Sequence, residues 1–408
     1  MKTKTWLLLI TIFLIYVGTG NANVMLGSAW PAISADIGVP VSWQSIVIVI
    51  FYIGAALGGA TAQNLLARLR TWVPAVAGIV LILINIFIFS ATASFPLMVV
   101  CSVIIGYSIG LEAAIVNGYV ARHYSATAMN WLHCFYGIGC TMAPTVLSYF
   151  ISVKDSWRMG YQMIGVIEIG VLVVLVVSVP LWRVHGPVFP RLRNAADDAG
   201  DTSLRHVVVA KPLGELIKLP GSLVIVFTMY VYCSFEVSIN CWATSFLTTE
   251  RGLAAGAAAG MMTLYFGAQV AGRIINGFLT RKYPDRRLIR IFLIATIIAT
   301  VLFVIAPDSL IAPVFIILGF ATGPMFPLLI HEIPSIVGDE NAQGVIGLQT
   351  AAANLGNASL PVIIGIVAGR FGFKVFPVFL IVLIFLSMLL KSAQDRGNEP
   401  REVAGGDV

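Results

Sequence analysis

The stretch Ile104–Val120, IIGYSIGLEAAIVNGYV, decides the class of this protein. It is a run of apolar and small residues long enough to cross a bilayer, which takes about 20 residues in a helix. Glu112 stands near its middle. A charge at that depth costs about 2.5–3.5 kcal/mol on insertion scales, so we expect Glu112 to face a bundle interior or a wet cavity and to act on a proton, an ion or a polar solute. The alternative is a structural glutamate that stays protonated against a neighbouring helix.

The composition of the whole chain is that of a membrane protein. Of the 408 residues, 58% are hydrophobic and 11% are charged, with a mean hydropathy of +0.92. Soluble domains carry about 25% charged residues. The five cysteines lie in apolar runs without the spacing of metal ligands, so we interpret them as small core residues. We therefore expect no soluble domain, no metal and no cofactor.

Twelve stretches are long and apolar enough to span a bilayer. They are roughly residues 6–30, 42–66, 72–93, 96–120, 128–152, 159–184, 219–247, 254–280, 288–306, 309–332, 341–369 and 372–392. The only long polar stretch separates the sixth from the seventh. We predict an all-α polytopic membrane protein made of an N-terminal six-helix bundle (1–184), a cytoplasmic linker loop (185–218), a C-terminal six-helix bundle (219–394) and a cytoplasmic tail (395–408).

The basic residues predict an orientation for these spans. With both termini in the cytoplasm, the inner segments hold 19 of the 25 lysines and arginines, and the outer loops hold 5. An excess of positive charge in cytoplasmic loops is the usual signal for orientation. We therefore predict that both termini are cytoplasmic. From the compact loops and the absence of a sorting segment we expect a bacterial plasma (inner) membrane protein.

Small residues recur at equivalent places in the two halves. Gly106–Gly110 in the fourth span matches Gly319–Gly323 in the tenth, each with glycines four residues apart. Gly139–Pro144 in the fifth span matches Gly356–Pro361 in the eleventh. Small residues let membrane helices approach closely. Their repetition predicts two related halves, which is a known plan of secondary transporters.

At these residues the chain resembles the major facilitator superfamily, over nearly its whole length. The second half carries a degenerate form of the family's basic motif at Gly272–Lys282, GRIINGFLTRK. In the first half only part of the motif is present, at Leu65–Arg70, LLARLR. Ala67 stands near the place of the usual acidic residue. The resemblance implies the two-bundle transporter fold. The missing acid argues against a standard gating salt bridge in the first half.

Within the superfamily the chain most resembles the fucose-permease-like group of proton-coupled sugar symporters. The matching segments are Gly110–Asn117 and Asn130–Gly137. The resemblance implies that Glu112 handles protons, and that His133 and Tyr136 of the fifth span lie at the sugar site. Some members carry an aspartate in the first span, where this chain reads GNANV at positions 20–24.

Glu112 and His133 fall at similar depth on consecutive spans. A Glu–His pair would suit proton handling, because imidazole titrates near neutrality. The alternative is that His133 is a neutral donor in helix packing. Glu168 in the sixth span has no polar neighbour three or four residues away, so we interpret it as a protonated packing residue outside the site.

Polar side chains also form stripes in the second half. Tyr232, Glu236 and Asn240 recur every fourth residue and so share one helix face. Glu236 is the second candidate for a coupling carboxylate. Gln269 and Arg273 follow the same spacing, and we predict that Arg273 pairs with a carboxylate or a helix end as part of a gate. Candidate solute contacts are the amides and aromatic side chains inside the spans: Asn21, Asn117, Tyr136, Tyr232, Asn240, Trp242, Gln269, Gln349 and Asn354.

These residue types favour a neutral polyhydroxylated solute, because anion carriers need more than one internal arginine. The leading hypothesis is a secondary active transporter that works by alternating access, as a monomer without nucleic-acid partners, importing a sugar or similar small polar solute with protons. The alternative is a proton-driven exporter of drugs or metabolites with the same fold. A channel fits duplicated halves with buried carboxylates less well than a carrier does.

A membrane enzyme is disfavoured. His331-Glu332 begins like the zinc-binding motif HExxH, but Ser335 stands where the second histidine would be, and no nucleophile constellation is present. We interpret His331-Glu332 as part of a gate or an interface.

Overall fold

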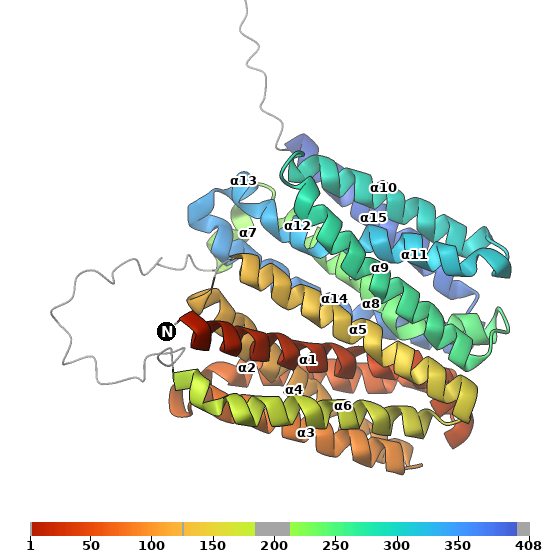
Figure 1. Cartoon of the computed structure of the whole chain (residues 1–408). Helices are drawn as coiled ribbons and strands as arrows, with labels where there is room; N and C mark the ends of the chain where they lie inside the picture. The colour runs from red at the N-terminus through yellow and green to blue at the C-terminus, as the bar shows by residue number, and fades with distance from the viewer. Residues whose placement is uncertain (1, 125, 184–212, 398–408) are drawn as a thin grey trace, which may run out of the picture.

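The computed structural model describes residues 2–124, 126–183 and 213–397, which are almost entirely helical (Figure 1). The long helices are α1 (Lys2–Ile37), α2 (Gln44–Arg68), α3 (Trp72–Ala91), α4 (Phe95–His123), α5 (Ala126–Lys154), α6 (Trp157–Ser178), α8 (Ser222–Thr249), α9 (Ala255–Leu279), α10 (Asp285–Ile305), α11 (Ile311–Thr322), α14 (Asp339–Phe371) and α15 (Val375–Gly397). The short helices are α7 (Leu213–Lys218), α12 (Met325–His331) and α13 (Ile333–Val337).

The helices confirm the predicted fold class. Eleven described segments are long and apolar enough to cross a membrane. The remaining predicted span is α9, which has 25 residues. Gln269 and Arg273 lie within it, and such polar residues lower its mean hydropathy. Figure 1 shows α1–α6 and α8–α15 as two bundles lying side by side.

The predicted tenth span is not one helix. The predicted span is present as one apolar segment, Asp308–Val337, but its helix is interrupted at Gly323-Pro324 between α11 and α12. Proline has no N–H to donate and its ring clashes with the preceding turn of a helix. A second proline, Pro327, follows the break and leaves the Gly323 carbonyl without a helical donor, and this carbonyl is used by the site described below.

The glycines that recur in the sequence occupy equivalent helix contacts. Gly106 and Gly110 lie against the backbone of α2, while Gly319 and Gly323 lie against the backbone of α9. A Cβ at any of these four positions would collide with the partner backbone. In the same way α5 packs on α1 and α14 packs on α8. The two halves are therefore built on the same helix contacts.

The bundles meet along α5 and α9, α2 and α14, and α1 and α8. Thr145 Oγ1 of α5 donates to Thr263 Oγ1 of α9 at 3.1 Å. Thr244 Oγ1 of α8 donates to the carbonyl of Gly27 in α1. These contacts lie towards the end of α1 that is remote from the N-terminus. At that end the two halves are closed against each other.

The observed helix ends differ from the predicted segment boundaries at two places. Residues 213–218 of the predicted linker form α7, and residues 184–212 lie outside the described part of the chain. Helix α15 continues to Gly397, so Asp395 belongs to the second bundle and not to a tail. The physical reason is that Asp395 is held by charged neighbours on α10 and on α15 itself.

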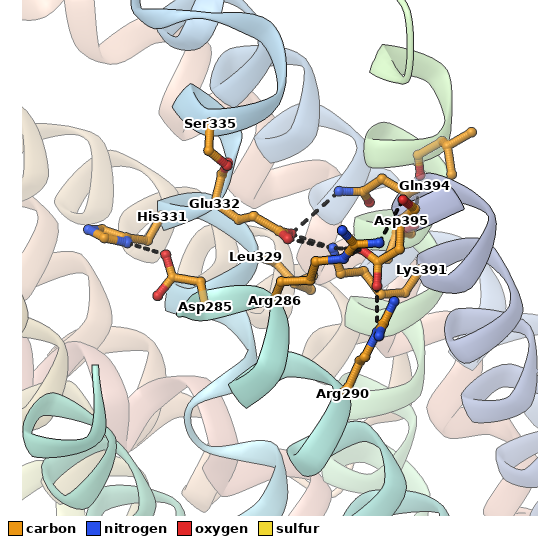
Figure 2. A network of polar contacts seen from close by, with 12 residues as sticks. Asp285, Arg286, Arg290, Leu329, His331, Glu332, Ser335, Lys391, Gln394 and Asp395 are labelled. Atoms are coloured by element: carbon orange, nitrogen blue, oxygen red, sulfur yellow. Dashed lines mark hydrogen bonds and ion pairs between the residues drawn. The ribbon is translucent and has the colours of Figure 1, made fainter. Parts of the chain in front are cut away.

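Those neighbours form an ion-pair cluster at one end of the second bundle (Figure 2). Lys391 Nζ lies 2.7 Å from Glu332 Oε1 and 2.9 Å from Asp395 Oδ1. Arg290 Nε lies 2.7 Å from Asp395 Oδ2, and Arg286 Nε lies 3.2 Å from Asp395 Oδ1. Lys391 is fully buried. The cluster joins α10, α15 and the junction of α12 with α13, so Glu332 pairs within one bundle instead of across a gate.

Candidate functional site

A polar cluster lies inside the second bundle, where α8, α9 and the end of α11 meet. Gln269 Nε2 donates to Glu236 Oε1 at 2.8 Å. Arg273 lies 4.0 Å from the same carboxylate oxygen. The side chains of Arg273 and Glu236 are 16% and 21% exposed, so this ion pair is only partly buried. The polar faces expected on the seventh and eighth spans therefore meet around one carboxylate.

Arg273 is held by a free backbone carbonyl beside the break between α11 and α12. Its Nε donates to the carbonyl of Gly323 at 3.0 Å. In a continuous helix this carbonyl would accept from the N–H four residues later, but Pro327 stands there and has none. The second prolyl residue of the segment thus leaves an acceptor that orients the guanidinium group towards Glu236.

Two buried hydroxyl groups also contact the side chain of Gln269. Its amide nitrogen also lies 3.1 Å from Tyr265 Oη and 3.2 Å from Thr322 Oγ1, so these two hydroxyl groups share its second hydrogen. Tyr232 Oη donates to the carbonyl of Thr322 at 2.8 Å. Tyr232 is fully buried. Tyr232, a predicted solute contact, is thus engaged with α11 in this conformation.

The first bundle presents aromatic and polar side chains at its own centre. Asn117 Nδ2 donates to Tyr16 Oη at 2.8 Å. The Tyr16 ring lies 5.9 Å from the His133 ring, edge to face, and 5.3 Å from the Tyr136 ring. We did not single out Tyr16 from the sequence. The signal available there was the one tyrosine of the apolar first span.

The two groups of polar residues meet across the α5–α9 contact. Gly137 lacks a side chain, and a Cβ there would lie 3.1 Å from Arg273 Nη1. Gly137 follows His133 by one helical turn on α5. The guanidinium group of α9 therefore reaches the surface of the first bundle, and the site includes residues of both halves.

Glu112 lies apart from this meeting point. It is fully buried, and neither of its oxygens has a hydrogen-bond partner among the described residues. Its carboxyl group lies against Gly78 of α3. The predicted pair of Glu112 with His133 is therefore not formed in this conformation, because Glu112 is directed towards α3 while His133 contacts Tyr16.

A small cavity of about 30 Å³ lies between the halves. Its lining includes Asn23, Gln44, Tyr52 and Asn240. Gln44 is buried, and both polar atoms of its side chain lack partners among the described residues. Of the predicted solute contacts, Asn240 therefore lies at the interface of the bundles. The cavity is large enough for water, which needs about 10–15 Å³ by this kind of measure, and too small for a sugar.

The other side chains that we predicted to contact the solute lie away from the cluster around Glu236. Trp242 is buried, and its indole N–H donates to the carbonyl of Pro361 at 2.7 Å. Gln349 Nε2 is directed to the carbonyl of Leu329 at 3.3 Å. Asn354 is exposed on α14, and Asn21 is fully buried beside Glu168. In this conformation these four side chains do not take part in the cluster around Glu236.

Known proteins resemble this chain over most of its length. A family profile described as Major Facilitator Superfamily matches residues 8–330 and, in a second and overlapping match, residues 226–406. Bypass of stop codon protein 6 of Saccharomyces cerevisiae is 21% identical over 321 residues, or 74% of this chain. The match spans 64% of the length of that yeast protein. Quinolone resistance protein NorA of Staphylococcus aureus is 23% identical over 386 residues, which is 90% of each chain.

Solved structures show the same fold. The crystal structure of a bacterial homolog to the human lysosomal transporter Spinster, in an inward-facing and occupied conformation, superposes with a TM-score of 0.75 at 15% identity and covers 96% of each chain. The nucleoside transporter NupG superposes with a TM-score of 0.71 at 14% identity, covering 98% of this chain and 100% of that one. Both similarities concern the arrangement of the helices.

Proposed function

The chain belongs to the Major Facilitator Superfamily of membrane transporters, and we propose that it moves a small polar solute together with protons by alternating access. The observation that carries the proposal is the cluster of Glu236, Gln269 and Arg273, in which the guanidinium group lies at Gly137 of α5, across the contact of the two halves. A titratable pair at such a contact lets proton binding change how the halves hold together.

We infer the following coupling step from the geometry of the cluster. With Glu236 ionised, the attraction of the carboxylate holds Arg273 at the α8–α9 contact. Protonation of Glu236 removes this attraction and leaves the guanidinium group hydrogen-bonded to the Gly323 carbonyl. The side chain is then free to move relative to α5, which it contacts at Gly137. Protonation would thus weaken the attachment of one half to the other.

The residues around the cluster favour a neutral solute with hydroxyl groups. Gln269, Tyr136 and Asn240 offer amide and hydroxyl groups, and Arg273 is already engaged by Glu236. A sugar or a similar polyhydroxylated molecule can accept from and donate to these groups without adding charge. We retain the uptake of such a solute with protons as the first proposal.

The experiment is a thermal-shift screen of the purified full chain, at acidic and at neutral pH, against sugars, sugar acids, nucleosides and drugs. A ligand that binds the folded state stabilises it in proportion to the logarithm of its concentration over its dissociation constant. We expect a neutral polyhydroxylated compound to raise the melting temperature of the wild type and not of Gln269→Ala. The control is Glu215→Gln, an exposed position on α7.

The compound found is then tested for accumulation in proteoliposomes under an imposed pH gradient. The wild type should accumulate it, and Glu236→Gln should exchange it without accumulation. Stabilisation by drugs alone, with no response to polar solutes, would overturn the sugar proposal.

A second candidate function is proton-driven export of drugs or metabolites. One observation favours it: the similarity to a protein named for quinolone resistance extends over 90% of both chains. Drug-sensitivity measurements in cells that express the chain distinguish the two directions. Increased drug resistance, lost in Glu236→Gln, would support export.

The remaining expectations belong to the same proposal. We propose that both termini are cytoplasmic, that the protein acts as a monomer, and that it resides in a bacterial plasma membrane. The distribution of lysine and arginine supports the orientation. Labelling of single cysteines introduced into loops, from either side of the membrane, tests it.

A further inference from the structure

The cavity of about 30 Å³ between the halves is bounded by contacts from one bundle to the other. Its lining residues come from α1 and α2 of the first bundle and from α8 of the second. Gly27 of α1 belongs to this lining, and its carbonyl accepts a hydrogen bond from Thr244 of α8. The cavity therefore lies in the surface along which the two halves meet.

The beginning of α2 is inserted into the second bundle beside the cavity. A Cβ at Gly365 of α14 would collide with Ser45 Oγ. One helical turn further along α14, a Cβ at Gly369 would lie 2.7 Å from Ser42 Cβ. Gln44, the first residue of α2, stands between these two serines in the sequence and lines the cavity. The insertion thus holds Gln44 at the contact of the halves.

Gln44 is the side chain from which the inference starts. It is 0% exposed, and neither Nε2 nor Oε1 has a hydrogen-bond partner among the described residues. A glutamine amide offers two donor hydrogens and one acceptor oxygen. Buried polar atoms in proteins almost always have a partner, either in the protein or in ordered water. The amide therefore calls for a small partner that both accepts and donates.

The second bundle presents an amide to the same cavity. Asn240 of α8 is among the lining residues, and its Oδ1 is buried without a hydrogen-bond partner among the described residues. Asn23 of α1 and Tyr52 of α2 complete the polar part of the lining. The volume holds about two water molecules, since one needs about 10–15 Å³ by this measure. Polar groups of both halves thus surround a space of the size of water.

The lining also limits the chemistry of the occupant. None of the nine lining residues has an acidic or basic side chain, so an ion in the cavity would be left uncompensated. A sugar ring is too large for it. Water is neutral, fits the volume, and both donates and accepts. We propose that Gln44 and Asn240 bind water at this place, so that a water bridge joins the two halves.

A water bridge suits a contact that has to open and close. Water that links two polar groups is nearly as favourable in enthalpy as a direct hydrogen bond, and its immobilisation costs little. When the halves separate, bulk water replaces the bridge, so the two amides stay hydrogen-bonded in both conformations. This role in opening rests on the proposed function, whereas the water site itself does not.

The first experiment is thermal unfolding of the purified full chain with Gln44→Met. Methionine has nearly the shape of glutamine, so the packing is kept while the amide is removed. If the amide is bonded to water, the variant should have a lower melting temperature than the wild type. If the amide has no partner, its removal should raise the melting temperature, and that result would overturn the proposal. The matched control is Gln162→Met, at an exposed position on α6.

The bridge itself is tested with a second variant. Asn240→Leu removes the other amide, and the double variant with Gln44→Met removes both. Because each single change already breaks the same bridge, the loss of melting temperature in the double variant should be smaller than the sum of the two single losses. Additive losses would show that no water joins the two side chains.

X-ray radiolysis detects the water directly, because it converts bound water into hydroxyl radicals that modify the side chains in contact with it. Cys241 lines the cavity and is 7% exposed. Mass spectrometry should find it modified in the wild type and less so in the double variant. Cys101, which is 1% exposed and lies outside the lining, is the internal control. Equal modification of Cys241 in both proteins would contradict a bound water.

The outcome is separable from that of the proposed function. Melting temperature and radiolysis require no transported solute, so their failure removes the water site and leaves the Glu236–Arg273 cluster to be tested by transport. Glucose serves as a probe for the other source of a hydroxyl group. Stabilisation by glucose that is lost in Gln44→Met, with Cys241 unmodified in the wild type, would overturn the proposal in favour of a contact to the solute.

Discussion

Arg273 is the residue on which the central cluster depends. It touches three elements through different atoms: the carboxylate of α8, the Gly323 carbonyl after α11 and the surface of α5 at Gly137. A guanidinium group presents several donors in a fixed plane, whereas an ammonium group is a compact point charge. The geometry at this position therefore requires arginine and not merely a positive charge.

We expect Arg273→Lys to fold and to lose proton-driven accumulation by about tenfold or more, because a hydrogen bond to a charged group contributes about 1.5–3 kcal/mol. The measurement is initial uptake in proteoliposomes with a pH gradient. The control is Arg370→Lys, which changes an exposed arginine at the end of α14. Equal uptake by both variants would contradict the role of the planar donors.

At the scale of helices, close contacts at glycine organise both bundles. Gly110 of α4 faces the Ala55 carbonyl of α2, and Gly319 of α11 faces the Tyr265 carbonyl of α9. Without hydrophobic driving force between helices in lipid, close van der Waals contact and hydrogen bonding hold them together. A methyl group at such a position must separate the helices, and separation also moves the polar residues that they carry.

Gly110→Ala should lower the melting temperature of the purified protein, because overpacking costs about 1–3 kcal/mol. The matched control lies on the same helix: Gly118 has open space where a Cβ would be. Gly118→Ala should leave the melting temperature unchanged or raise it, since alanine is favoured over glycine in helices by about 1 kcal/mol. Similar melting temperatures for the two variants would contradict the close contact.

The ion-pair cluster around Lys391 joins α10, α15 and the junction of α12 with α13 at one end of the second bundle. Lys391→Met should destabilise the fold by about 3–5 kcal/mol, because removing one partner leaves buried charge uncompensated. Adding Glu332→Leu should restore most of the loss, since Asp395 keeps Arg286 and Arg290. Thermal unfolding of the single and the double variant measures these changes in stability. The control is Lys374→Met, which changes an exposed lysine. No recovery in the double variant would contradict this assignment.

At the scale of the whole molecule, the two halves are closed at the end of α1 remote from the N-terminus. Thr145 and Thr263 face each other there across α5 and α9. Alternating access requires this end to open during transport. A covalent link across it should therefore stop the cycle without disturbing either bundle.

The double variant Thr145→Cys with Thr263→Cys should form a cross-link on oxidation and lose transport, and reduction should restore it. The native cysteines are free and buried or half-buried, and each single variant controls for them. Uptake is measured before oxidation, after oxidation and after reduction. Undiminished uptake by the cross-linked protein would show that this end does not open.

The sequence by itself determined that the chain is helical, that it consists of two related halves, and which helix faces carry polar groups. This was possible because a bilayer demands about 20 apolar residues per span, and because side chains four residues apart share a helix face. It thus placed Glu236, Gln269 and Arg273 on the right faces before any contact was known. The repeated glycines likewise indicated contacts within each half, since close approach requires small residues.

Only the tertiary structure decided which polar groups meet. Pro327 leaves the Gly323 carbonyl free, but Arg273 reaches it from another helix. Glu168 has no polar neighbour on its own helix, and its carboxyl group lies against Gly18 when α1 and α6 pack together. Trp242 finds its acceptor at Pro361 on α14. Helical periodicity fixes the direction of a side chain on its own helix, whereas its partner is fixed by the packing of helices distant in sequence.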